Sequence, residues 1–152
     1  MIPNNTEFQK LIRKLIYLTH TRPDISYSVQ TLSQHIYAPL ESYVKAAFLI
    51  LRYLKRSPSK GIHIAKSPGV FSLTNYSDAD WGKRLINRRS ATAYCLFMCG
   101  SLISWKSKKQ PTISRSSTES KYRALAATTC EIDWVLKLLS DFGLKDLLRA
   151  EL

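Results

Sequence analysis

Apolar residues recur every three or four positions through roughly the first 56 residues and then at every second position, which predicts helices followed by a sheet. Thr6 can cap a first helix, Pro23 separates it from a second helix over about 24–36, and a third helix precedes Ser57. The positions predicted to form the apolar faces of these helices are Phe8, Leu11, Leu15, Leu18, Ile25, Val29, Leu32, Ile36, Val44, Ala47, Phe48, Leu51 and Leu54.

A segment rich in turn-forming residues, 57–61, divides the chain into a helical segment over 1–58 and a second domain over 61–152. The second domain predicts strands at 62–66, 71–80, 91–98 and 102–106, with 112–114 extending the sheet. A capping box at 116–119 opens a long helix that stops near Gly143, and 144–152 is expected to be helical or frayed. The apolar side predicted for this helix consists of Tyr122, Leu125, Ala126, Trp134, Leu138 and Leu139.

These elements place the chain in the α+β class: three helices, then an antiparallel meander of three to five strands with a long helix on one face. A sheet covered by a single helix is incomplete by the usual rules of layered folds. The strand over 71–80 is therefore expected to lie at a sheet edge, with unpaired backbone amides.

Composition limits the classes of protein to which this chain can belong. The hydrophobic fraction of 45% is typical of a globular chain, and no apolar run is long enough to span a membrane. The N-terminus lacks the pattern of a secretory signal, and the odd set Cys95, Cys99 and Cys130 is typical of reduced thiols. An intracellular location, cytoplasmic or nuclear, is expected, with no membrane partner.

The net charge of +12 favours a polyanionic partner. Ten basic residues lie from position 81 to 123, where Glu119 is the only acid. They are Lys83, Arg84, Arg88, Arg89, Lys106, Lys108, Lys109, Arg115, Lys121 and Arg123. Aromatic and hydroxyl side chains alternate with these charges, which favours nucleic acid over the alternative of a merely solvated basic face.

Two acids, Asp78 and Asp80, end the strand over 71–80 and are expected to share one face of it, where carboxylates suit Mg²⁺. A polar strand end is the alternative. Other candidates are weaker: His20, His35 and His63 have no metal-binding spacing, and Ser116, Ser117 and Thr118 are explained by helix capping. Trp105 and Trp134 are predicted core residues, whereas Trp81 lies beside the acids.

Several motifs in order resemble the ribonuclease H domain of copia-type retrotransposon Pol proteins. They are Tyr76-Ser77-Asp78-Ala79-Asp80-Trp81, Arg88-Arg89-Ser90, Ser104-Trp105-Lys106-Ser107-Lys108-Lys109-Gln110, Ser116-Ser117-Thr118-Glu119 and Tyr122-Arg123-Ala124-Leu125. Three upstream motifs resemble the segment that joins reverse transcriptase to ribonuclease H: Tyr17-Leu18-Thr19, Thr21-Arg22-Pro23-Asp24-Ile25-Ser26-Tyr27 and Ile50-Leu51-Arg52-Tyr53-Leu54-Lys55. The resemblance covers about residues 7–143 and implies an incomplete ribonuclease H-like fold.

The resemblance also implies metal-dependent cleavage of RNA in RNA–DNA hybrids by four acids and two Mg²⁺ ions. Asp78 matches the first acid, Lys121 occupies the position of the usual glutamate, and the last two aspartates would lie beyond Leu152. Glu119 faces elsewhere on the helix, and Asp80 is too far along the strand to replace the missing ligand. A truncated, non-catalytic domain that does not hold Mg²⁺ stably is therefore expected.

Three functional readings stay open on the sequence. The chain is a degenerate Pol remnant without activity, or a module that binds nucleic acid without sequence preference through its basic residues, or a nuclease completed by a partner chain. The basic residues predicted to bind nucleic acid are Lys83, Arg84, Arg88, Arg89, Lys106, Lys108, Lys109 and Arg115. The partners implied are an RNA–DNA hybrid or duplex and, in intact relatives, the rest of the Pol polyprotein.

Overall fold

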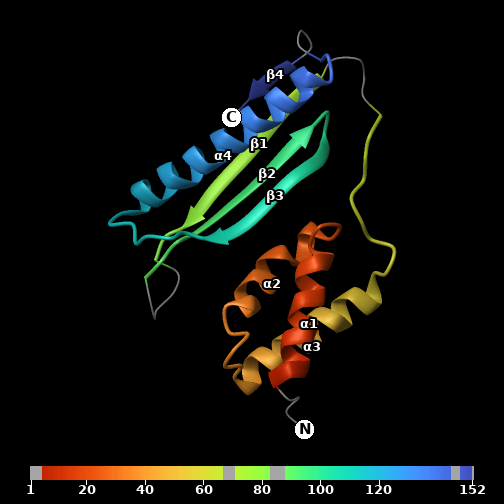
Figure 1. Cartoon of the computed structure of the whole chain (residues 1–152), viewed down its shortest axis with the longest axis vertical. Coiled ribbons are helices and arrows are strands. Elements are labelled where there is room, and N and C mark those ends of the chain that lie inside the picture. The colour runs from red at the N-terminus through yellow and green to blue at the C-terminus, as the bar shows by residue number, and fades with distance from the viewer. Residues whose placement is uncertain (1–4, 67–70, 83–87, 145–147, 152) are drawn as a thin grey trace. The chain divides into compact units, whose positions relative to one another are not determined.

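The computed structural model describes residues 5–66, 71–82, 88–144 and 148–151, and it divides into two compact units, Met1–Ile62 and His63–Leu152 (Figure 1). Unit 1 contains α1 (Asn5–Leu18), the 3-10 turn η1 (Pro23–Ile25), α2 (Ser26–Ser33) and α3 (Glu41–Arg56). Unit 2 contains β1 (Phe71–Asp80), β2 (Ala91–Met98), β3 (Ser101–Lys109), α4 (Ser117–Asp141) and β4 (Leu148–Glu151).

The core of unit 1 follows the predicted helical periodicity closely. Its buried residues are Phe8, Ile12, Leu15, Ile25, Val29, Leu32, Val44, Ala47 and Ile50. Leu11, Leu18, Ile36, Leu51 and Leu54 are half-buried against this core. The prediction was wrong for Phe48, which is 48% exposed because Ile50 takes the inward position on α3. The second helix is shorter than predicted, because Pro23 opens a 3-10 turn and α2 ends at Ser33.

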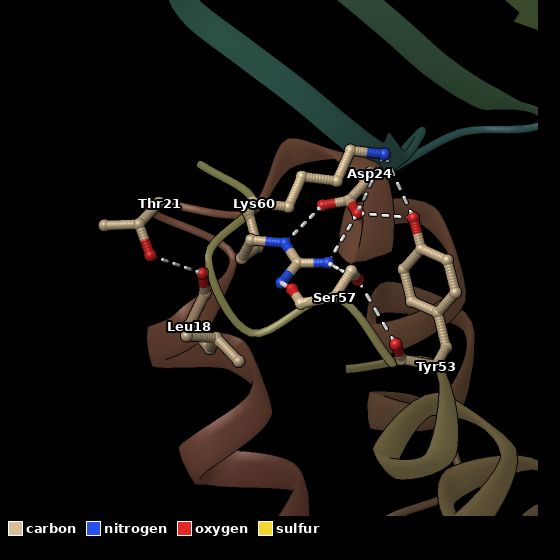
Figure 2. Close-up of polar contacts among 7 residues, drawn as sticks. Leu18, Thr21, Asp24, Tyr53, Ser57 and Lys60 are labelled. Carbon is tan, nitrogen blue, oxygen red and sulfur yellow. Dashed lines mark hydrogen bonds and ion pairs between the residues drawn. The ribbon is translucent and has the colours of Figure 1, made fainter. Parts of the chain in front are cut away.

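A network of hydrogen bonds around Arg22 joins the start of η1 to the end of α3 in unit 1 (Figure 2). The buried Arg22 guanidinium donates to both carboxylate oxygens of Asp24, at 3.0 and 2.9 Å, and to the Ser57 carbonyl at 2.9 Å. Tyr53 donates to Asp24 at 2.7 Å, and the Lys60 ammonium lies 3.7 Å from the same carboxylate. Because Ser57 is the C-cap of α3, Arg22 satisfies a carbonyl that the end of the helix leaves unpaired.

This network of hydrogen bonds makes the stability of unit 1 depend on Asp24. The hydrogen bond from Arg22, followed by that from Tyr53, holds the pKa of Asp24 well below its usual range. A lowered folded-state pKa contributes stability that is complete above the unfolded pKa of about 4 and is lost as the pH falls below it. We expect Asp24→Asn to lower the free energy of unfolding by about 1–2 kcal/mol at pH 7, after allowance for solvent screening. The variant should also lose less stability than the unmodified chain as the pH falls.

Urea unfolding followed by far-ultraviolet circular dichroism at pH 7 and pH 3 measures this effect. Glu7→Gln is the matched control, because Glu7 forms an ion pair with Lys10 in the same unit but is 63% exposed. The control should change stability by only a few tenths of a kcal/mol. Equal losses in the two variants would contradict a special role for Asp24.

The sheet of unit 2 has the strand order β3-β2-β1-β4. β1, β2 and β3 form the predicted antiparallel meander, with Asp78 opposite Ala93 and Ala93 opposite Ser107. β4 adds a parallel strand that pairs with the start of β1, from Phe71 opposite Leu148 to Thr74 opposite Glu151. The fold is thus α+β, with α4 packed on one face of this sheet (Figure 1).

The structure corrects four expectations about the sheet. β1 is paired with both β2 and β4 over Leu73–Thr74, so the prediction that it forms an edge holds only for its residues after Thr74, within the described residues. Leu148–Glu151 is a strand, not a helix or a frayed end, because its backbone satisfies the open side of β1. Neither 62–66 nor 112–114 forms a strand, although Ala65 N–H donates to Ser101 Oγ at 2.8 Å.

The ends of α4 follow the sequence prediction. Ser116 Oγ accepts from the Glu119 N–H at 3.0 Å, while the Glu119 carboxylate accepts from the Arg115 N–H at 2.7 Å. At the other end Gly143 adopts φ +83°, and the N–H groups of Gly143 and Leu144 donate to Ser140 and Leu139. This pair of bonds is a Schellman motif, which confirms Gly143 as the stop.

The buried stripe of α4 differs from the predicted one. The residues facing the sheet are Ser120, Ala124, Thr128, Ile132 and Val135, with Leu136 and Leu139 half-buried. Of the predicted apolar side, Tyr122, Leu125, Ala126, Trp134 and Leu138 are exposed. Small side chains in the first half of the helix let its backbone approach the sheet, so the larger apolar residues lie on other faces.

Candidate functional site

Asp78 and Lys121 form the centre of the candidate site. Asp78 lies in the second half of β1, and Lys121 lies in the first turns of α4. Lys121 Nζ is 3.9 Å from Asp78 Oδ1, and both side chains are largely exposed, at 67% and 71%. An ammonium group therefore occupies the position beside Asp78 from which a second carboxylate would have to hold a cation.

The neighbouring acids do not complete a metal site. Asp80 is on the same face of β1 as Asp78, two residues further along the strand. Glu119 is engaged elsewhere, since it accepts from the Arg115 N–H and from the Arg123 guanidinium at 2.9 Å. The backbone hydrogen bond from Arg115, followed by that from Arg123, lowers the pKa of Glu119. Among the residues described here, no group of three or more His, Cys, Asp or Glu side chains could hold a metal ion.

A buried polar network fixes the start of α4 against the sheet, and Gln110 is its hub. The Gln110 side-chain amide donates to Thr92 Oγ1 at 3.0 Å and to the Ser120 carbonyl at 2.9 Å. Its carbonyl oxygen accepts from Ser114 Oγ at 3.1 Å. Because Ser120 directly precedes Lys121, this network determines where Lys121 stands relative to β1.

The predicted nucleic-acid-binding residues gather partly at one end of the sheet. Lys109 is paired with Ala91 and Lys108 with Thr92, so the end of β3 lies beside the start of β2, which Arg88 and Arg89 precede by three and two residues, respectively. Lys106 and Lys108 are exposed on the side of the sheet that carries α4, whereas Lys109 is on the other side. Arg115 is exposed just before α4, while Lys83 and Arg84 lie outside the described residues.

The tryptophans, histidines and cysteines considered in the sequence analysis differ in their burial and contacts. Trp81 is 51% exposed, and its indole N–H donates to the Ser114 carbonyl at 2.9 Å. Trp105 is half-buried, but Trp134 is 59% exposed, so its prediction as a core residue was wrong. His35 stacks on Tyr43 at 4.0 Å between ring centroids. Cys95 and Cys130 are free thiols, and Cys99 lies in the turn between β2 and β3.

Two sets of residues that shape the units were not singled out from the sequence. Gln110 and Arg22 both stand in motifs that resemble the Pol family, yet each has a partner far away in the chain: Thr92 is 18 residues from Gln110, and Ser57 is 35 residues from Arg22. A polar residue at the end of a strand or between two helices gives no pattern from which such partners can be deduced.

No described helix is long and apolar enough to cross a membrane.

Comparison with known proteins finds retrotransposon Pol polyproteins. The chain is 40% identical over 144 residues to the retrovirus-related Pol polyprotein from transposon RE2 of Arabidopsis thaliana, which covers 95% of this chain and 10% of that protein. It is 42% identical over 140 residues to the Pol polyprotein from transposon RE1 of the same plant, covering 92% of this chain and 10% of the relative. The chain is therefore similar to one segment of retrotransposon Pol polyproteins. It spans about a tenth of the length of these two relatives.

A third relative is much closer to this chain in length. It is named secreted RxLR effector protein 161, from Plasmopara viticola, and is 36% identical over 132 residues, which cover 86% of this chain and 92% of that protein. No family model matches the chain. No solved structure matches it. The resemblance to retrotransposon Pol polyproteins inferred from the motifs is therefore confirmed, and the matched region extends through both units.

Proposed function

We propose that this chain is a ribonuclease H-like segment of a copia-type Pol protein that does not cleave RNA–DNA hybrids. The ion pair between Lys121 and Asp78 carries this proposal. A two-metal mechanism needs several carboxylates to hold two dications against their mutual repulsion, and a cation at the second ligand position disfavours even one ion. The meander followed by a helix, with Asp78 near the end of its first strand, supports the ribonuclease H-like assignment.

Cleavage of a labelled RNA–DNA hybrid in Mg²⁺ and in Mn²⁺ tests this proposal. The purified chain is expected to leave the hybrid intact, as is Asp78→Asn, while an active ribonuclease H serves as the positive control. Metal-dependent cleavage that disappears in Asp78→Asn would overturn the proposal and establish a working active site, whether complete in one chain or shared between copies.

A second candidate function is binding of duplex or hybrid nucleic acid without cleavage. The location of Arg88, Arg89, Lys108 and Lys109 at one end of the sheet, with Lys108 and Lys109 on opposite faces, favours it, and we call these four residues the basic cluster. Exposed cations bind phosphates with little sequence preference, and each phosphate neutralised on B-DNA adds about −0.9 to the log–log salt slope.

Replacing all four residues of the basic cluster by alanine should flatten that slope by about 3–4 and weaken duplex binding. Fluorescence anisotropy with a labelled duplex over a range of salt concentrations measures both quantities. The matched control replaces Arg13, Lys14, Arg52 and Lys55, which are exposed in unit 1, and so removes the same charge elsewhere. Equal flattening in the two variants would show that net charge, rather than the basic cluster, drives binding.

A further inference from the structure

Unit 1 has a groove between α2 and α3 that neither candidate function uses, and we call it the helical groove. Its volume is about 680 Å³. Apolar and aromatic side chains form much of its lining, among them Leu32, Tyr43, Leu49, Ile50 and Tyr53. Leu49 is 61% exposed. The acid in the wall, Asp24, already accepts hydrogen bonds from Arg22. A groove of this kind between two helices suits the apolar side of a third helix.

Basic side chains border the helical groove along α3. Lys45, Arg52 and Arg56 stand four, three and seven residues from Leu49, so the helix places them on the side of α3 next to it. All three are exposed. Lys45 pairs with Glu41 at 2.8 Å, whereas Arg52 and Arg56 have no acidic partner within the described residues. The border of the groove therefore favours a helix that carries acids beside its apolar side.

A helix of this description is present in unit 2, in the second half of α4. Trp134, Leu138 and Phe142 follow one another at intervals of four residues, so they lie along one side of the helix, and we call them the α4 stripe. They are 59%, 38% and 73% exposed, respectively. Because α4 turns other residues toward the sheet, packing within unit 2 leaves this apolar side largely in contact with solvent.

The α4 stripe is acidic in a chain that is otherwise strongly basic. Residues 131–142 contain three acids, Glu131, Asp133 and Asp141, and one base, Lys137, which gives a net charge of −2 against +12 for the whole chain. Lys137 pairs with Asp133 at 2.7 Å. Asp141 is exposed and has no basic partner within the part of the chain that the structure describes. It stands seven residues after Trp134 and so lies beside it on the helix.

We propose that the helical groove of one copy of this chain takes the α4 stripe of a second copy. The apolar side chains of the stripe enter the groove, and Asp141 lies toward Arg52 and Arg56 on its border. Burial of exposed apolar surface favours association, and the opposite charges select the orientation. Both surfaces are separate from the Asp78 region and from the basic cluster.

The net charge of the chain does not prevent this contact. At physiological ionic strength, exposed charges more than about 8 Å apart are largely screened, so repulsion between distant parts of two copies is weak. The two surfaces that meet carry opposite charges at short range, where screening is least.

Sedimentation velocity of the full chain at rising concentration and physiological salt tests the proposal. The mean sedimentation coefficient should rise with concentration. Trp134→Ala should weaken association about tenfold, because a buried tryptophan commonly anchors an interface, and Leu49→Asp should weaken it from the other surface. Tyr122→Ala and Tyr17→Ala are the matched controls, since these tyrosines are 67% and 80% exposed but lie outside both surfaces. The controls should associate like the unmodified chain.

An exchange of charge distinguishes this contact from non-specific association. The double variant Arg52→Glu with Arg56→Glu has an acidic groove and an acidic stripe, whereas Asp141→Lys has a basic groove and a basic residue on its stripe. Each variant alone should associate more weakly than the unmodified chain. An equimolar mixture should recover association, because each groove then meets a stripe of opposite charge. All three residues are exposed, and circular dichroism verifies that the variants keep their helices.

Three outcomes would overturn the contact between copies. One is a chain that stays monomeric at every concentration, whether or not its groove takes another partner. Another is association that Tyr122→Ala or Tyr17→Ala weakens as much as Trp134→Ala does. The third is a mixture of the two charge variants that associates no better than either variant alone.

Discussion

Lys121→Glu is expected to give the Asp78 region a measurable affinity for Mn²⁺ while leaving RNA–DNA hybrid uncleaved. The substitution removes an ammonium 3.9 Å from Asp78 and places a second carboxylate at the same position of α4. Hard divalent cations bind to carboxylate oxygens, and a two-carboxylate site with water completing the shell is weak, with a dissociation constant on the order of 1 mM. Paramagnetic broadening of nuclear magnetic resonance signals from β1 and α4 measures this binding.

Cleavage should still be absent in Lys121→Glu, because one weakly held ion cannot stabilise both the attacking and the leaving oxygen. Lys121→Gln separates the two effects of the substitution, since it removes the cation without adding a ligand. Mn²⁺ should bind Lys121→Glu more tightly than Lys121→Gln, and the double variant Asp78→Asn with Lys121→Glu should lose that gain. Equal binding by the unmodified chain and Lys121→Glu would contradict the blocking role of Lys121.

The helical unit was largely predictable from the sequence, because its apolar residues recur with the helical period and face one core. The long helix of unit 2 was predictable in its ends but not in its buried face. Its cap at Ser116 and its stop at Gly143 are local signals. Its sheet-facing side begins with Ser120, Ala124 and Thr128, whose small or hydroxyl side chains do not register as apolar in a periodicity analysis.

Long-range pairing was the other feature that the sequence did not reveal. β4 pairs in parallel with β1 although the two strands are separated by more than 65 residues, and its four residues carry no strand pattern of their own. For the candidate site, motif order placed Lys121 opposite Asp78, and the structure brings the two side chains together. The same motifs included Gln110, but its role depends on Thr92, Ser114 and Ser120, which only the fold assembles.

Gln110→Ala is expected to lower the free energy of unfolding of unit 2 by about 2–4 kcal/mol, because it removes three buried hydrogen bonds and leaves their partners unsatisfied. Thr92, Ser114 and Ser120 are each at most 8% exposed, so solvent cannot replace the lost amide without opening the end of the sheet. Urea unfolding followed by tryptophan fluorescence measures the loss, with all three tryptophans of the chain in this unit.

Gln110→Glu tests whether the hydrogen bonds, rather than the volume of the side chain, stabilise this end of the sheet. Glutamate has nearly the same shape, but it replaces the amide donor with an acceptor that faces the Ser120 carbonyl, so it should cost at least as much as alanine. Gln9→Ala on α1 is the control for loss of a glutamine outside the network and should have little effect on unit 2. A stable Gln110→Glu variant would show that the network is not what holds the start of α4, and with it Lys121, against β1.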